Sequence, residues 1–175
     1  STVDNVFLYD KKSGELFNGE NYFDHSSLKS LYSITATGED VFYVASSDRL
    51  LTLSPLTRTF SQKSLSEHFP NISSLDAVKY GAGYLFLGGP EGLYQVDISS
   101  NKTTFFRFER NTDYPVEIER IYISKNEDVW VAAGELYYLK DGELRTTDFL
   151  NPLLSTESFR SVMDIEESEQ GELLI

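Results

Sequence analysis

The sequence has no cysteine, one tryptophan, two histidines and no long hydrophobic run. Because cysteine is absent, disulfide scaffolds and thiolate zinc sites are excluded. The longest apolar runs, such as residues 41–45, are five residues long, whereas a helix that crosses a bilayer needs about 20. We therefore expect no direct insertion into a membrane.

Basic residues are also scarce. The chain has 15 Lys and Arg residues against 28 Asp and Glu residues, which gives a formal net charge of −13. Nucleic-acid binding depends on clustered Lys and Arg side chains that release counterions from the phosphates. We therefore expect no nucleic-acid partner.

Apolar side chains, by contrast, are plentiful. Hydrophobic residues make up 40% of the 175 residues, and aromatic residues make up 14%. This is enough to build a core, so global disorder is excluded. The length corresponds to about one domain.

An internal repeat is the strongest pattern in the sequence. Short apolar runs begin at residues 41, 85, 129 and 173, each 44 residues after the previous one. A second series, Leu50, Leu93 and Leu136, has a spacing of 43 residues. Two series with nearly the same period indicate a repeated structural unit.

Each unit contains four segments with the composition of short β-strands. In one unit these are residues 75–80, 84–87, 93–97 and 103–108, and glycine, proline or asparagine lies in each gap. Such residues favour the tight turns of antiparallel hairpins. The pair Asp141-Gly142 is by itself a strong hairpin signal.

The second strand of each unit is apolar on both faces, as expected of a strand in a sheet that is packed between two other sheets. Four strands in a period near 44 residues are typical of β-propeller blades. Parallel β-helices have shorter repeats, helical repeats need a 3.6-residue period, and a sandwich would not keep this register. The sequence therefore predicts an all-β fold of about four antiparallel blades. The expected boundaries are a partial blade 1–28, blades 29–71, 72–117 and 118–159, and a partial blade 160–175.

The two ends of the chain fall inside blades. Residues 6–10 match the third strand at 93–97, and residues 173–175 match a second strand. One interpretation is a closed ring of four blades in which the ends pair. The preferred interpretation is a piece of a larger propeller, because blade counts run from about 4 to 8 and four is the low extreme. The remaining blades of the parent propeller are then expected partners.

Two stretches carry a family resemblance. One has Val129-Trp130-Val131 followed by a small residue and glycine, and the other has Gly92-Leu93-Tyr94 before a third strand. These units resemble the two-component-regulator propeller repeats, and the resemblance extends over essentially the whole chain. The unit at residues 33–53 departs from the pattern, because Ser46-Ser47-Asp48-Arg49 replaces the glycine turn and Phe42 takes the position of Trp130.

The resemblance implies a location and a role. Such repeats build the extracytoplasmic sensor regions of bacterial hybrid histidine kinases and some diguanylate cyclases. It implies a periplasmic, non-catalytic ligand-sensing module, with a small molecule or an oligosaccharide as the ligand. No cofactor is expected, and the kinase or cyclase is not encoded in these residues.

Propeller ligands are usually held at the face formed by the inter-blade connections and the turns between second and third strands. Charged side chains on this face could hydrogen-bond a sugar, and an aromatic ring could stack on it. The alternative interpretation is that the aromatic residues of the connections, Phe69 among them, hold their own loops on the blades. The predicted ligand-binding residues are Asp48, Arg49, Glu91, Arg110, Asp113 and Tyr114.

Other chemistry has weaker support. His25 and His68 lie about one blade apart in polar segments, so no metal site is expected, since a zinc site needs converging ligands. No Gly-x-Ser-x-Gly motif occurs, and the carboxylates lie in turns and surface runs, so no catalytic residue is assigned. Two alternatives stay open. One is a protein-interaction propeller with an acidic face, self-association as a homodimer included, and the other is a propeller glycan hydrolase.

Overall fold

The computed structural model describes residues 7–9, 11, 14–18, 31–38, 41–57, 59–108, 117–146, 162 and 164–175. These residues form three four-stranded antiparallel sheets and two two-stranded ones. Blade 1 contains β3 (Leu31–Thr37), β4 (Val41–Ser46), β5 (Arg49–Ser54) and β6 (Thr59–Ser64). Blade 2 contains β7 (Ala77–Gly81), β8 (Tyr84–Gly89), β9 (Gly92–Asp97) and β10 (Lys102–Arg107). Blade 3 contains β11 (Arg120–Ile123), β12 (Val129–Ala133), β13 (Glu135–Lys140) and β14 (Glu143–Thr146).

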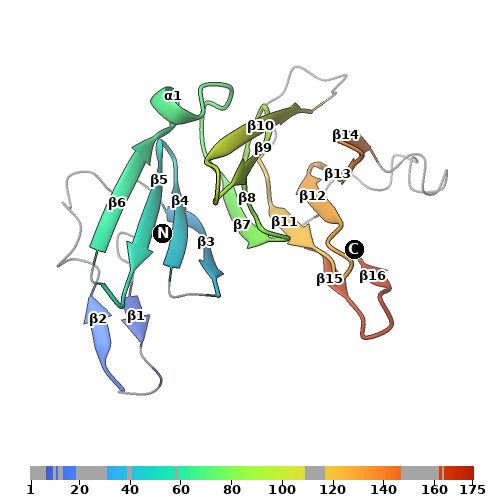
Figure 1. Cartoon of the computed structure of the whole chain (residues 1–175). Helices are drawn as coiled ribbons and strands as arrows, with labels where there is room; N and C mark the ends of the chain where they lie inside the picture. Colours follow the sequence, from blue (N-terminus) through green and yellow to red (C-terminus); the bar gives the residue numbers. More distant parts are fainter. Residues whose placement is uncertain are drawn as a thin grey trace.

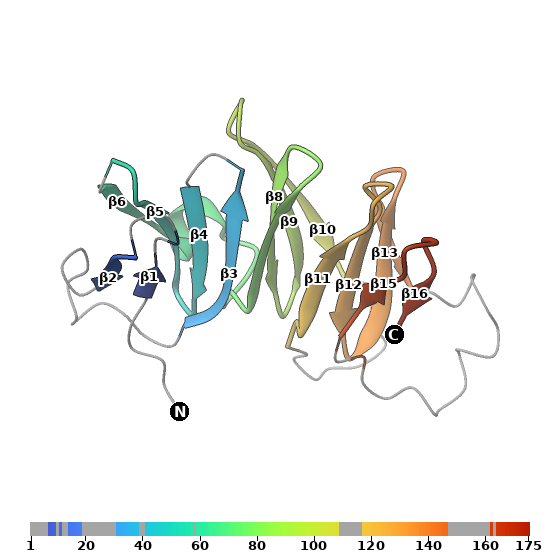
Figure 2. The same cartoon turned by 90° about the horizontal axis from the view of Figure 1, so that it is seen from below.

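Two smaller sheets flank the three blades. The N-terminal half-blade consists of β1 (Phe7–Tyr9) and β2 (Leu16–Asn18), and the C-terminal half-blade of β15 (Glu166–Glu167) and β16 (Leu173–Leu174). Figures 1 and 2 show the half-blades at opposite ends of a row of sheets. The one helix of the described residues, α1 (Leu65–His68), leads from blade 1 to blade 2. None of the residues in these ranges forms a helix long and apolar enough to cross a bilayer.

Each blade is a simple meander in which every strand pairs with the next one along the chain. The tight turns have the expected chemistry: Asp141 and Gly142, which join β13 and β14, both have positive φ angles, 52° and 80°. Two consecutive positive φ angles are the mark of a type I′ hairpin turn, which suits the twist of the strands. The hairpin predicted from these two residues is therefore confirmed.

The first strands of successive blades lie beside one another, β3 against β7 and β7 against β11. At the first of these contacts, hydroxyl groups of β3 reach the backbone of β7. Ser33 Oγ lies 3.2 Å from both the nitrogen and the carbonyl oxygen of Val78, and Tyr80 N–H donates to Thr35 Oγ1 over 3.0 Å. These bonds satisfy backbone groups of β7 that face away from β8, its partner strand.

The core lies between the sheets. Leu50 of blade 1 packs with Val78 and Leu87 of blade 2, and Leu93 of blade 2 packs with Val131 of blade 3. Leu136 of blade 3 packs in the same way with Ile165 beside the C-terminal half-blade. The series Leu50, Leu93 and Leu136 therefore marks one structural position, the face of each third strand that meets the following blade.

One expected equivalence is wrong by a single residue. The strand pairings that match across the three blades are Ala45–Leu50, Gly88–Leu93 and Ala132–Leu136. Two residues earlier on the same face of each second strand are Tyr43, Phe86 and Trp130. Phe42 instead lies on the opposite face of β4, in a cluster with Val44 and Leu51. Equivalent residues of the second strands in blades 1 and 2, such as Ala45 and Gly88, are 43 residues apart rather than 44. Because side chains alternate along a strand, this difference of one residue places Phe42 on the opposite face.

Candidate ligand-binding face

The turn between the second and third strands lies at the same edge of a meander as the exit of the fourth strand, because all neighbouring strands are antiparallel. In blade 1 this edge holds the β4–β5 turn and the connection 65–76, which leads to blade 2. The two are bonded through the backbone: Leu65 N–H donates to Asp48 O over 3.1 Å, and Leu75 N–H donates to Ser47 O over 3.3 Å. This edge is the face on which the sequence predicts ligand binding.

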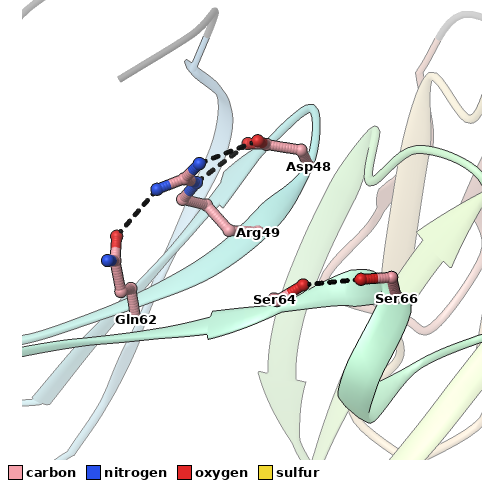
Figure 3. A network of polar contacts seen from close by, with 5 residues as sticks. All are labelled: Asp48, Arg49, Gln62, Ser64 and Ser66. Atoms are coloured by element: carbon pink, nitrogen blue, oxygen red, sulfur yellow. Dashed lines mark hydrogen bonds and ion pairs between the residues drawn. The ribbon is translucent and has the colours of Figure 1, made fainter. Parts of the chain in front are cut away.

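Asp48 and Arg49 form a polar network on this face. Arg49 Nε and Nη2 donate to the two carboxylate oxygens of Asp48 over 2.9 and 2.8 Å, and Nη1 donates to Gln62 Oε1 over 3.0 Å. Figure 3 shows the guanidinium between Asp48 and Gln62, and the Ser64–Ser66 hydroxyl pair close to the start of α1. The hydrogen bond with Asp48 raises the pKa of Arg49 above its usual value. Both charged side chains remain partly open to solvent.

Glu91 occupies the corresponding turn of blade 2, between β8 and β9. Its carboxylate Oε2 accepts a hydrogen bond from Ser73 N–H over 2.9 Å, and its carbonyl accepts one from Phe108 N–H over 3.2 Å. Ser73 belongs to the same connection that the β4–β5 turn holds. The structure thus brings three predicted residues, Asp48, Arg49 and Glu91, to the two turns that clamp one connection.

The aromatic residue of this connection is part of the core. Phe69 is buried and packs edge-to-face on Tyr94, with ring centroids 5.3 Å apart. The Tyr94 hydroxyl accepts a hydrogen bond from Asn71 N–H over 3.2 Å. Phe69 therefore holds its own loop on blade 2, as the alternative interpretation of these aromatic residues predicts. The predicted residues Arg110, Asp113 and Tyr114 lie outside the described residues, as does His25.

Asp76 belongs to the same connection, and it is not among the binding residues predicted from the sequence. Its Oδ2 accepts a hydrogen bond from Ile118 N–H of the next connection over 3.2 Å, and Ser74 Oγ donates to its Oδ1 over 3.1 Å. Burial raises the pKa of this carboxyl, and the nearby Glu117 and Glu91 add to the rise. One signal could have identified it: Asp76 immediately precedes the first strand of its blade, where a short polar side chain can reach the neighbouring backbone.

Within the ranges that the structure describes, no three metal-ligating side chains converge. His68 is exposed, and its Nδ1 lies 4.0 Å from the Glu67 carboxylate. Of the predicted binding residues that the structure describes, Asp48 and Glu91 offer carboxylates and Arg49 offers a guanidinium for hydrogen bonding.

Comparison with known proteins gives matches in structure only. No protein-family model matches the sequence, and no curated protein sequence matches it. The extracellular domain of BT4673 from B. thetaiotaomicron, assigned to a one-component and to a hybrid two-component system, matches with a TM-score of 0.74 at 15% identity, over 97% of this chain and 22% of that one. The extracellular domain of BT3049, a hybrid two-component system of B. thetaiotaomicron, matches with a TM-score of 0.62 at 15% identity, over 96% of this chain and 21% of that one.

A propeller from another setting matches too. The WD40 propeller domain of Doa1 has a TM-score of 0.62 at 14% identity, over 97% of this chain and 53% of that one. The chain is a β-propeller segment. This segment spans about a fifth of the two B. thetaiotaomicron domains, and its described sheets do not close into a ring. The fold predicted from the repeat is confirmed, and two-component sensor domains of the suspected kind are among the proteins that share it.

Proposed function

We propose that this segment belongs to the sensor region of an extracytoplasmic, periplasmic bacterial signal-transduction receptor, and that it binds a ligand without catalysing a reaction. The observation that carries the proposal is the match over 97% of the chain to the extracellular domain of BT4673. The repeat signatures around Val129-Trp130-Val131 and Gly92-Leu93-Tyr94 support the same family. The proposed ligand is an oligosaccharide.

The proposed binding residues are Asp48, Arg49 and Glu91, together with Arg110, Asp113 and Tyr114 of the following connection. Sugar hydroxyls both donate and accept hydrogen bonds, so carboxylates and a guanidinium on one face suit them. Arg49 already uses Nε, Nη1 and Nη2 within the protein. A sugar would therefore bind by adding to this network through the exposed carboxylate of Asp48, while Arg49 keeps that carboxylate in place.

The geometry also suggests how binding would be sensed. The connection between blades 1 and 2 is held at Asp48 O by Leu65 N–H and at the Glu91 carboxylate by Ser73 N–H. A ligand that takes the Glu91 carboxylate as its own partner would release Ser73, and the connection between the two blades would shift. Ligand binding at Glu91 would in this way change the position of blade 1 relative to blade 2.

Titration calorimetry with a panel of neutral and acidic oligosaccharides tests the proposal. For an oligosaccharide that binds, Asp48→Ala and Glu91→Gln should each weaken the affinity about tenfold, which corresponds to about 1.4 kcal/mol. Arg145→Ala is the matched control, because Arg145 also pairs with a carboxylate, Glu143, but lies on the outermost strand β14.

Two results would contradict the proposal. One is an affinity that stays unchanged in the Asp48→Ala, Glu91→Gln double variant. The other is shortened oligosaccharide in the mass spectrum after incubation with the protein, because this would show hydrolysis.

A further inference from the structure

Two backbone amides at equivalent positions of the repeat have different kinds of acceptor. Asp76 and Glu119 are equivalent, because each donates its N–H to the same second-strand position of its own blade. The residues just before them, Leu75 and Ile118, are therefore equivalent too. Leu75 N–H donates to a backbone carbonyl of blade 1, Ser47 O, over 3.3 Å. Ile118 N–H donates instead to a carboxylate oxygen, Asp76 Oδ2, over 3.2 Å.

We call the first of these contacts the blade 1–2 junction and the second the blade 2–3 junction. A backbone carbonyl does not titrate between about pH 3 and pH 7, whereas a carboxylate does. The acceptor at the blade 2–3 junction can therefore change its charge with acidity, and the acceptor at the blade 1–2 junction cannot.

The Asp76 carboxylate also holds its own connection. Its Oδ1 accepts a hydrogen bond from Ser74 Oγ over 3.1 Å, and the preceding amide, Ser73 N–H, donates to Glu91 Oε2 over 2.9 Å. Two carboxylates therefore hold consecutive residues of one connection, and Asp76 also reaches the segment that enters blade 3. Its side chain is half-buried, so its charge is only partly solvated.

The charges that face Asp76 are both negative. They are Glu91 of the β8–β9 turn and Glu117, which directly precedes Ile118. In the part of the chain that the structure describes, no ion pair includes Asp76, Glu91 or Glu117. Three carboxylates from three different segments thus meet at this junction. They repel one another when all are ionised, and the repulsion falls when one of them binds a proton.

We propose that the blade 2–3 junction is sensitive to pH: a proton on Asp76 stabilises the contact between the two connections, and loss of that proton weakens it. The neutral carboxyl keeps an oxygen that accepts from Ile118 N–H, and it gains a hydroxyl that can donate. The ionised carboxylate accepts a stronger hydrogen bond, but it is half-buried and faces two like charges. The neutral form is favoured, because burial and these charges outweigh the hydrogen bonds and raise the pKa of Asp76.

The direction of the response follows from this rise. A pKa that is higher in the closed junction than in free solution gives a stabilisation that is complete below the ordinary carboxyl value of about 3.9. The stabilisation is lost as the pH rises through the pKa of Asp76 in the folded chain. This inference does not rest on the proposed ligand, because the groups involved belong to the chain itself.

Amide hydrogen exchange of the 15N-labelled chain, followed by NMR from about pH 3.5 to pH 7, tests the inference. Each rate is divided by the intrinsic rate at the same pH to give a protection factor. Protection of the Ile118 amide should fall about threefold or more as the pH rises, in keeping with the strength of partly exposed charge pairs. Protection of the Leu75 amide should stay constant. In Asp76→Asn, protection of Ile118 should no longer depend on pH.

A second measurement separates the charge effect from a merely structural role. The 13C shift of the Asp76 carboxyl gives its titration midpoint, which Glu117→Gln should lower because it removes a facing charge. Glu119→Gln is the matched control, since Glu119 is also exposed and lies two residues away, and it should leave the midpoint unchanged. Protection of Ile118 that is constant or rises with pH would overturn the inference. An equal fall at Leu75 would also overturn it, because the response would then belong to the whole molecule.

Discussion

At the scale of single residues, Asp76 shows how one partly buried carboxyl can connect two blades and carry an electrostatic cost. Its hydrogen bonds with Ile118 N–H and Ser74 Oγ favour the charged form, but burial outweighs them and the pKa is raised. A pKa that is higher in the folded than in the unfolded chain means that protonated Asp76 stabilises the fold. This contribution is complete below the unfolded pKa and is lost as the pH rises through the folded one.

The variant Asp76→Asn should therefore be at least as stable as the natural chain at pH 7, and its stability should fall less between pH 4 and pH 7. Asparagine keeps an acceptor for Ile118 N–H and can donate to Ser74 Oγ. Urea unfolding at a series of pH values measures both effects. Asp76→Ala is the contrasting variant: it should lose about 1–3 kcal/mol because it leaves the Ile118 N–H without its partner. Equal stability of the alanine and asparagine variants would contradict this role for the hydrogen bonds.

Tyr138 offers a second test at this scale. Its hydroxyl donates to Asp128 Oδ1 over 2.7 Å, and this bond, with burial and the charge of Asp128, raises the pKa of Tyr138 to about 12. The stabilising contribution should be complete below pH 10 and be lost as the pH rises through 12. In a tyrosinate absorbance titration, Tyr138→Phe should remove a step near pH 12, and it should cost about 1 kcal/mol of stability at pH 7. Loss of a step near pH 10 instead would show that the bond with Asp128 is not formed.

At the scale of elements, the end of β8 is packed too closely for any side chain. A Cβ atom at Gly89 would lie 2.2 Å from the carbonyl oxygen of Ser74, and a backbone atom cannot easily move away. We expect Gly89→Ala to lower the free energy of unfolding by about 2 kcal/mol or more, as overpacking does in other cores. Gly38→Ala is the control, because a Cβ at Gly38 meets nothing within 4 Å. Thermal unfolding of the two variants measures the difference, and equal midpoints would contradict the prediction.

The elements also show where sequence reasoning succeeds and where it stops. Leu50, Leu93 and Leu136 could be matched from spacing alone, because each fills the same site beside the following blade. The faces of β4 could not be assigned, because Phe42 and Tyr43 are both aromatic and the strand is apolar on both sides. Position at the candidate ligand-binding edge of the blades was predictable for Asp48 and Glu91, since both lie in turns between second and third strands. Their partners were not, because the backbone N–H groups of Ser73 and Leu65 have no signature in the sequence.

At the scale of the whole molecule, blades that contact only their neighbours should transmit damage only locally. Glu167 attaches the C-terminal half-blade to blade 3, because its Oε2 accepts hydrogen bonds from Tyr122 O–H and Lys125 N–H over 3.0 and 2.9 Å. Glu167→Ala should therefore lower hydrogen-exchange protection in residues 164–175 and leave blade 1 unchanged. Glu169→Ala, at an exposed position of the same half-blade, is the control. A loss of protection that spread evenly over all three blades would show global rather than local coupling.

The hydroxyl groups of β3 have a further consequence. The amides of Val78 and Tyr80 belong to blade 2, but their hydrogen bonds go to Ser33 and Thr35 of blade 1. Their exchange with solvent deuterium therefore measures the separation of blade 1 from blade 2 while both blades remain folded. If blade 1 swings away from blade 2, these two amides should exchange while the amides bonded between β7 and β8 stay protected. Comparing the exchange rates of these two sets of amides therefore measures how readily blade 1 separates from blade 2, and it needs no attached label.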